Sequence, residues 1–187
     1  HRSWGPIEAF DFSTPEFLKK NGVYTHIVTD HQHYWEDGGE GYLPRYSSFD
    51  CIRGQEGDYW IGQVDRTKDV EDLSTKNNGC SPSKLKVQDK INRKQMKTEE
   101  KHPMFRVHKG GMNFIERNKD ADNWFLQIEH FDPHEPFFAP EKYKNLYNNK
   151  KYSGEEFDWP NYKVVSEDEN MISRAKENYA ALVSMCD

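Results

Sequence analysis

Long apolar runs are missing from this sequence, and none approaches the ~20 residues that a membrane-spanning helix needs. An excess of basic residues is also missing, because the net charge is −6, and this argues against a general nucleic-acid-binding protein. The cysteines Cys51, Cys80 and Cys186 are too few and too scattered for a disulfide framework, and they do not indicate a compartment. We therefore expect no membrane span, no nucleic-acid partner and no disulfide scaffold.

Hydrophobic residues are sparse at 34%, but aromatic residues are abundant at 14%. This composition predicts an aromatic-rich core and argues against disorder throughout the chain. With 187 residues the chain has the size of one domain, which can bury ~70% of the surface that its unfolded form exposes.

The rest of the chain is organised around the segment 123–138. Its first half, residues 124–129, is an aromatic and aliphatic run with little polar alternation, which is typical of a strand buried on both faces. Pro133 and Pro136 lack the backbone donor that a central strand needs, so the chain must leave the sheet at about Phe131. The loop that follows therefore lies at the carboxyl end of a strand, where α/β sheets usually build ligand sites.

Three polar residues, Asp132, His134 and Glu135, lie on this loop. They could form a functional cluster. Alternatively, the two carboxylates satisfy the backbone of the turn and His134 packs against Phe137. The loop taken alone favours the second interpretation.

The N-terminal third predicts parallel α/β structure. A helix start is predicted at residues 13–16, where Thr14 can cap and Pro15 fits the first turn, or where Ser13 and Glu16 form a capping box, and the helix ends before Gly22. Residues 23–29 are rich in β-branched side chains and predict a strand, and residues 46–53 are a second strand candidate. A helix, a glycine and a strand in this order form half of a parallel unit.

The middle of the chain is predicted as a polar surface excursion at about residues 63–102, with one helix at residues 86–96. A helix after Pro103 leads into the strand at residues 124–129, and a short helix is predicted within residues 140–147.

A last helix is predicted with Ser166 and Glu169 as its capping box. Its pattern continues to Asp187 without a terminating residue, so we expect the chain to be an internal part of a longer protein. The stripe predicted to be buried consists of Ile172, Ala175, Tyr179, Leu182, Val183 and Cys186.

A second group of candidate site residues follows the strand at residues 23–29. His31 and His33 flank Gln32 and precede Tyr34 and Trp35, and the pair could bind a metal or an anionic ester, or lie on a solvated loop. Two imidazoles are one or two ligands short of a zinc site. The following carboxylates, Glu36 and Asp37, could complete it, but their spacing is generic.

Several of these motifs resemble the sulfatases of the alkaline phosphatase superfamily. Leu126-Gln-Ile-Glu, Asp132-Pro-His-Glu-Pro-Phe-Phe and Pro140-Glu-Lys-Tyr together are similar to the Pro-His-x-Pro segment of that family. The resemblance implies that His134 touches the sulfate ester and assists the departure of the leaving group. Further matches are Tyr46-Ser-Ser-Phe, Arg53-Gly-Gln-Glu-Gly-Asp and Tyr179-Ala-Ala-Leu-Val-Ser-Met-Cys-Asp.

Thr29-Asp-His-Gln-His33 resembles the Gly-Lys-x-His segment with which these enzymes contact the sulfate, although the lysine is absent. The resemblance implies substrate-binding roles for the residues Thr29, Asp30, His31 and His33, beside His134.

Cys80-Ser-Pro-Ser-Lys84 resembles the nucleophile motif Cys-x-Pro-Ser-Arg, whose cysteine is oxidised to formylglycine. In the family this motif precedes the segment that matches residues 14–53, whereas Cys80 follows it, so we interpret Cys80 as a surface thiol. The family's metal-binding Asp pair and its later Asp-His or Asp-Asn pair are not found either. A divalent metal (calcium or magnesium) and formylglycine are therefore expected in the complete enzyme and not bound to this fragment, which is expected to be inactive alone.

The resemblance implies that residues 1–187 are an internal part of an arylsulfatase-like catalytic domain, with a three-layer α/β/α sandwich of the alkaline phosphatase type. The implied function is a sulfuric ester hydrolase, whose partners are a sulfated small molecule or glycan and the remainder of the catalytic domain. One alternative is a phosphate or phosphonate ester hydrolase of the same superfamily. Another is a non-catalytic domain that binds an anionic glycan through Tyr34, Trp35, Trp159 and Tyr162.

Overall fold

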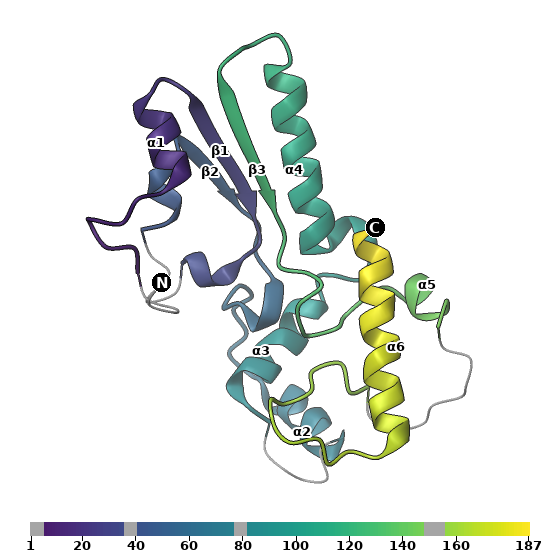
Figure 1. The fold of residues 1–187 in the computed structure, drawn as a ribbon. Coiled ribbons are helices and arrows are strands. Elements are labelled where there is room, and N and C mark those ends of the chain that lie inside the picture. The colour runs from purple at the N-terminus through teal and green to yellow at the C-terminus, as the bar shows by residue number, and fades with distance from the viewer. Residues whose placement is uncertain (1–5, 36–40, 77–81, 148–155) are drawn as a thin grey trace. The chain divides into compact units, whose positions relative to one another are not determined.

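The computed structural model describes residues 6–35, 41–76, 82–147 and 156–187 (Figure 1). The chain divides into two compact units. The first consists of His1–Asp58 and Glu100–Phe131, and the second of Tyr59–Glu99 and Asp132–Asp187. Within the described ranges no helix combines the length and the apolar character needed to cross a membrane.

The first unit contains a parallel sheet of three strands in the order β2-β1-β3. The strands are β1 Tyr24–Thr29, β2 Ser48–Cys51 and β3 Trp124–Glu129, so the predicted strands at residues 23–29 and 124–129 are confirmed and lie in one sheet. The prediction that β3 is buried on both faces is wrong. Its residues are all half-buried, because β3 is an outer strand of the three and β1 is the central one.

Two helices of the first unit are those expected from the sequence. Helix α1 spans Thr14–Lys20 with Ser13 as its N-cap residue and a proline in the first turn, and α4 spans Pro103–Asn118. Gly22 has a φ of 82°, a left-handed conformation that ends α1 and starts the turn into β1. The sequence therefore placed both helices correctly, because proline and glycine mark their ends.

The core of the first unit lies on both faces of β1. Ile27 points to a cluster with Leu43 and Tyr46, and Val28 points to a cluster with Ile52 and Val107 of α4. This alternation follows from the period of two residues in a strand.

A pair of glycines brings α4 close to the sheet. A Cβ atom added at Gly110 would lie 2.8 Å from Cγ1 of Val28, and one added at Gly111 would lie 2.6 Å from Cγ1 of Ile128. Both distances are too short for carbon atoms that are not bonded to each other. The close approach of helix and sheet therefore requires glycine at these positions.

We expect Gly111→Ala to lower the free energy of unfolding by about 1–2 kcal/mol, because overpacking costs ~1–3 kcal/mol and exceeds the ~1 kcal/mol gain in helix propensity. Urea denaturation measures this change. The matched control is Gly62→Ala, where an added Cβ meets open space. Combining Gly111→Ala with Ile128→Ala should cost less than the sum of the two single variants, since Ile128 is the group that clashes. Additive costs would contradict this packing.

The second unit is helical. Its helices are α2 Thr67–Lys76, α3 Lys84–Arg93, α5 Glu141–Lys144 and α6 Glu169–Cys186. Single 3-10 turns of the first unit lie at Gln32–Tyr34, Leu43–Arg45 and Gln55–Gly57. A fourth, Glu99–Lys101, spans the point in the sequence where the second unit gives way to the first.

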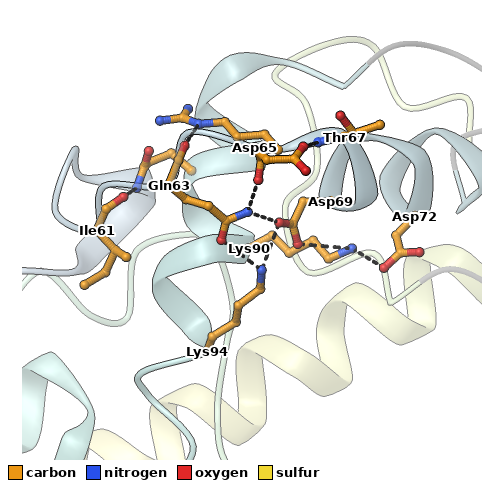
Figure 2. Close-up of polar contacts among 10 residues, drawn as sticks. Ile61, Gln63, Asp65, Thr67, Asp69, Asp72, Lys90 and Lys94 are labelled. Carbon is orange, nitrogen blue, oxygen red and sulfur yellow. Dashed lines mark hydrogen bonds and ion pairs between the residues drawn. The ribbon is translucent and has the colours of Figure 1, made fainter.

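The predicted polar excursion contains α2 and α3, of which the sequence predicted only α3. Figure 2 shows what holds the two helices together. The buried carboxylate of Asp69 accepts hydrogen bonds of 2.7 Å from Gln63 and 2.8 Å from Lys94, and Lys90 lies between Asp69 and Asp72. A helix that packs through buried ion pairs has too weak an apolar stripe to be recognised from sequence.

Helix α6 begins two residues later than predicted and buries a face that shares only Leu182 with the predicted stripe. Its N-cap is Asp168, whose carboxylate accepts hydrogen bonds from the backbone N–H groups of Asn170 and Met171. Tyr179 is 45% exposed, contrary to prediction. The buried residues are Arg174, Asn178, Ala181, Leu182 and Met185.

Glu156 explains why α6 buries this face. Its carboxylate accepts a hydrogen bond of 3.1 Å from Arg174, and its backbone carbonyl accepts one of 2.7 Å from Asn178. These contacts turn a partly polar face of α6 inward, which apolar spacing does not predict.

Candidate functional site

The candidate site of the first unit lies where β1 and β3 end. Thr29 of β1 is paired with Glu129 of β3 in the parallel register, so the loops that follow both strands start at the same edge of the sheet. His134 follows β3 in the sequence and belongs to the second unit. Its contact with the ester stays a prediction.

Thr29 and Asp30 hold this edge together from the inside, and both are fully buried. The Thr29 hydroxyl accepts a hydrogen bond of 3.0 Å from the backbone N–H of His31. The Asp30 carboxylate accepts hydrogen bonds of 2.7 Å from the backbone N–H of Phe131 and 3.2 Å from the side chain of Gln55. Asp30 thus joins the end of β1 to the chain that leaves β3, and direct substrate contact by Thr29 and Asp30 stays a prediction.

Burial raises the pKa of Asp30 to about 6, although the hydrogen bonds from Phe131 and Gln55 act in the opposite direction. A buried carboxyl group with a raised pKa, next to His31 in the chain, is a feature common at functional sites.

His31 is held by a carboxylate. Its Nδ1 lies 3.3 Å from Oε1 of Glu129. Burial acts to raise the pKa of Glu129, but hydrogen bonds from His31, Tyr34 and Gln127 outweigh it and hold that pKa below its ordinary value. Glu129 is therefore ionised and accepts a proton-bearing Nδ1, which fixes the orientation of the imidazole.

The other nitrogen of His31 is the notable atom of the site. Nε2 is buried and has no hydrogen-bond partner among the residues that the structure describes. A buried polar atom without a partner costs about 1–3 kcal/mol, so a ligand that hydrogen-bonds Nε2 would recover this free energy. A histidine anchored at one nitrogen, with the other nitrogen unpaired, is the arrangement found in catalytic and ligand-binding imidazoles.

His33 lies beside His31, with 5.4 Å between the ring centroids. Its Nε2 lies 3.3 Å from the Glu56 carboxylate, which also accepts a hydrogen bond of 2.9 Å from Gln32. Glu56 has a φ of 49°, which is rare for a residue with a side chain and often found at functional sites. Phe131 lies against both imidazoles, at 4.9 and 5.9 Å between centroids.

A second ionic group borders this edge. Arg53 donates two hydrogen bonds, of 2.6 and 2.7 Å, to the buried carboxylate of Asp58. The indole of Trp35 donates to the same carboxylate at 3.4 Å, and the Arg53 guanidinium lies 5.4 Å from the centre of the Trp35 ring. Trp35 is therefore packed into an ionic cluster of the first unit.

Among the residues that the structure describes, no group of three or more His, Cys, Asp or Glu side chains could hold a metal ion. Glu36, Asp37 and Cys80 lie outside the described residues.

His134 lies in the loop that opens the second part of the second unit. Its side chain is 37% exposed, and Nδ1 lies 2.9 Å from the backbone carbonyl of Glu135. The Glu135 carboxylate in turn accepts a hydrogen bond from the Tyr162 hydroxyl. Asp132 is buried, and Phe137 packs against Tyr179 with 5.2 Å between ring centroids. The imidazole of His134 is thus partly accessible, and the loop that carries it is held by the contacts of Glu135 with Tyr162 and of Phe137 with Tyr179.

The sequence indicated His31 and His33 but not their anchors, Glu129 and Glu56. The parallel register contained a signal for Glu129, since it ends β3 beside Thr29. No such signal exists for Glu56, because its contact depends on the turn that follows Gly54.

Comparison of the chain with protein families, with curated proteins and with solved structures finds no match. The evidence for a function therefore comes from the residues of the chain.

Proposed function

We propose that this chain is part of a sulfuric ester hydrolase and that the edge formed by β1 and β3 binds the sulfate group. The observation that carries the proposal is His31, whose Nδ1 is anchored by Glu129 while the buried Nε2 lacks a partner among the described residues. The sulfatase resemblance of residues 126–143 supports it. On this proposal the parallel sheet belongs to a three-layer α/β/α sandwich of the alkaline phosphatase type.

His31 and His33 would bind the sulfate oxygens. Both nitrogens of an imidazolium donate hydrogen bonds, so His31 can donate to Glu129 through Nδ1 and to a sulfate oxygen through Nε2. Thr29 and Asp30 would fix the backbone that carries the two histidines. Glu129 and Glu56 would keep the rings oriented before the ester arrives, which lowers the entropic cost of reaching the reactive geometry.

His134 would assist the departure of the leaving group, as the resemblance implies. An imidazole can protonate a departing oxygen near neutral pH, because its ordinary pKa lies in that range. Calcium or magnesium and formylglycine would be supplied by the remainder of the catalytic domain, where formylglycine provides the nucleophile when it is present.

The direct test is a pair of hydrolysis assays on the complete enzyme that contains this chain, using 4-nitrophenyl sulfate and 4-nitrophenyl phosphate. The two esters share a leaving group and differ mainly in charge. We expect a higher kcat/KM for the sulfate ester and no turnover of either ester by the 187-residue chain alone. Faster hydrolysis of the phosphate ester would favour the phosphatase alternative. Binding of a sulfated glycan without any hydrolysis would favour a binding domain.

A further inference from the structure

A cavity of about 170 Å³ lies within the second unit, between α3 and the segment that follows Glu156. Aliphatic and aromatic side chains make up much of its wall, including Leu73 of α2, Phe157 and Trp159. Phe157 has a φ of 47°, so the backbone is held in an unfavourable conformation where it lines the cavity.

The charged side chains of the cavity already have partners. Arg93 lies 2.7 Å from the carboxylate of Asp89 and 2.5 Å from that of Asp158. Lys90 pairs with Asp72 at 2.8 Å, and Lys86 donates to the backbone carbonyl of Trp159 at 3.4 Å. An anion would have to compete with these carboxylates for the same cations, so the cavity favours a neutral ligand.

Neutral sugars match this combination of groups. A pyranose ring offers apolar C–H faces, which pack on aromatic side chains, and hydroxyl groups, which both donate and accept hydrogen bonds. Carboxylates and a guanidinium held by ion pairs present fixed acceptors and donors to such hydroxyls. We propose that this cavity binds a neutral monosaccharide unit, with Trp159 and Phe157 as the packing surface and Asp158 and Arg93 as hydrogen-bonding partners. The proposal does not depend on sulfate ester hydrolysis at the edge of β1 and β3.

The test is ligand-observed NMR on the full chain with D-glucose, D-galactose and N-acetyl-D-glucosamine, each titrated with and without inorganic sulfate. We expect saturable binding of at least one sugar that sulfate does not displace. Trp159→Ala should weaken binding by about tenfold or more, which corresponds to ~1.4 kcal/mol. Tyr59→Ala is the matched control, since this tyrosine lies in the same unit, is 73% exposed and does not line the cavity.

A second variant separates loss of the ligand site from loss of the fold. Leu73→Trp adds volume to the wall, and it should abolish sugar binding while leaving the melting temperature within a few degrees of the parent. The proposal is overturned if no sugar binds saturably, if sulfate displaces the sugar, or if folded Leu73→Trp binds as well as the parent protein.

Discussion

Replacing His134 with alanine in the complete enzyme should lower turnover by about 10²–10⁴-fold, the usual contribution of a general acid or base. The loss should appear in kcat as well as in kcat/KM, because the contact is made mainly in the transition state. The melting temperature should change little, since the side chain is 37% exposed.

The matched control is His108→Ala, which removes an exposed histidine of α4. It should leave turnover within about twofold of the parent, as expected for an exposed position outside the site. If His134 were a structural residue, its replacement would instead lower the melting temperature and leave the activity of the folded fraction intact. That result would contradict the role proposed for His134.

The second large effect concerns Asp30, whose pKa rises from 3.8 in the unfolded chain to about 6 in the folded protein. Between these two values the folded state binds more protons than the unfolded state, so stability falls as the pH rises from about 4 to above 6. This shift in pKa corresponds to about 3 kcal/mol in the free energy of unfolding. Asp30→Asn should remove this penalty, so the variant should gain about 3 kcal/mol on the parent between pH 4 and pH 7.

Urea denaturation across this pH range measures the difference in the free energy of unfolding between Asp30→Asn and the parent. Groups that titrate in the same way in both proteins do not contribute to this difference. Glu116→Gln, which removes an exposed carboxylate of α4, is the control and should parallel the parent. A constant difference between Asp30→Asn and the parent from pH 4 to pH 7 would show that Asp30 titrates normally in the folded protein.

The strands of the first unit could be predicted because their side chains are β-branched or aromatic and because glycine and proline mark where they begin and end. The half-burial of β3 could not be predicted, since the sequence of a strand does not reveal the position of that strand in the sheet. Helix α2 and the buried face of α6 could not be predicted for another reason. Both are held by pairs such as Asp69 with Lys94 and Glu156 with Arg174, which join residues far apart in the sequence.

The histidines of the candidate site could be predicted, because imidazoles after a strand are a visible local pattern. What could not be predicted is which of their nitrogens is already bonded. The contact between His31 and Glu129 joins residues that are 98 positions apart, and it leaves Nε2 as the nitrogen without a hydrogen-bond partner among the described residues. Tertiary contacts of this kind decide the chemistry of a site and are not recorded in local sequence patterns.

The central proposal is that His31, oriented by Glu129, binds the sulfate ester. It is tested most directly by a double-mutant cycle on the complete enzyme, in which kcat/KM for 4-nitrophenyl sulfate is measured for His31→Ala, Glu129→Gln and the double variant. If Glu129 acts through His31, the two losses do not multiply, so the double variant should be only slightly slower than the slower single variant. Independent losses that multiply in the double variant would contradict the proposal that Glu129 positions His31 for the ester.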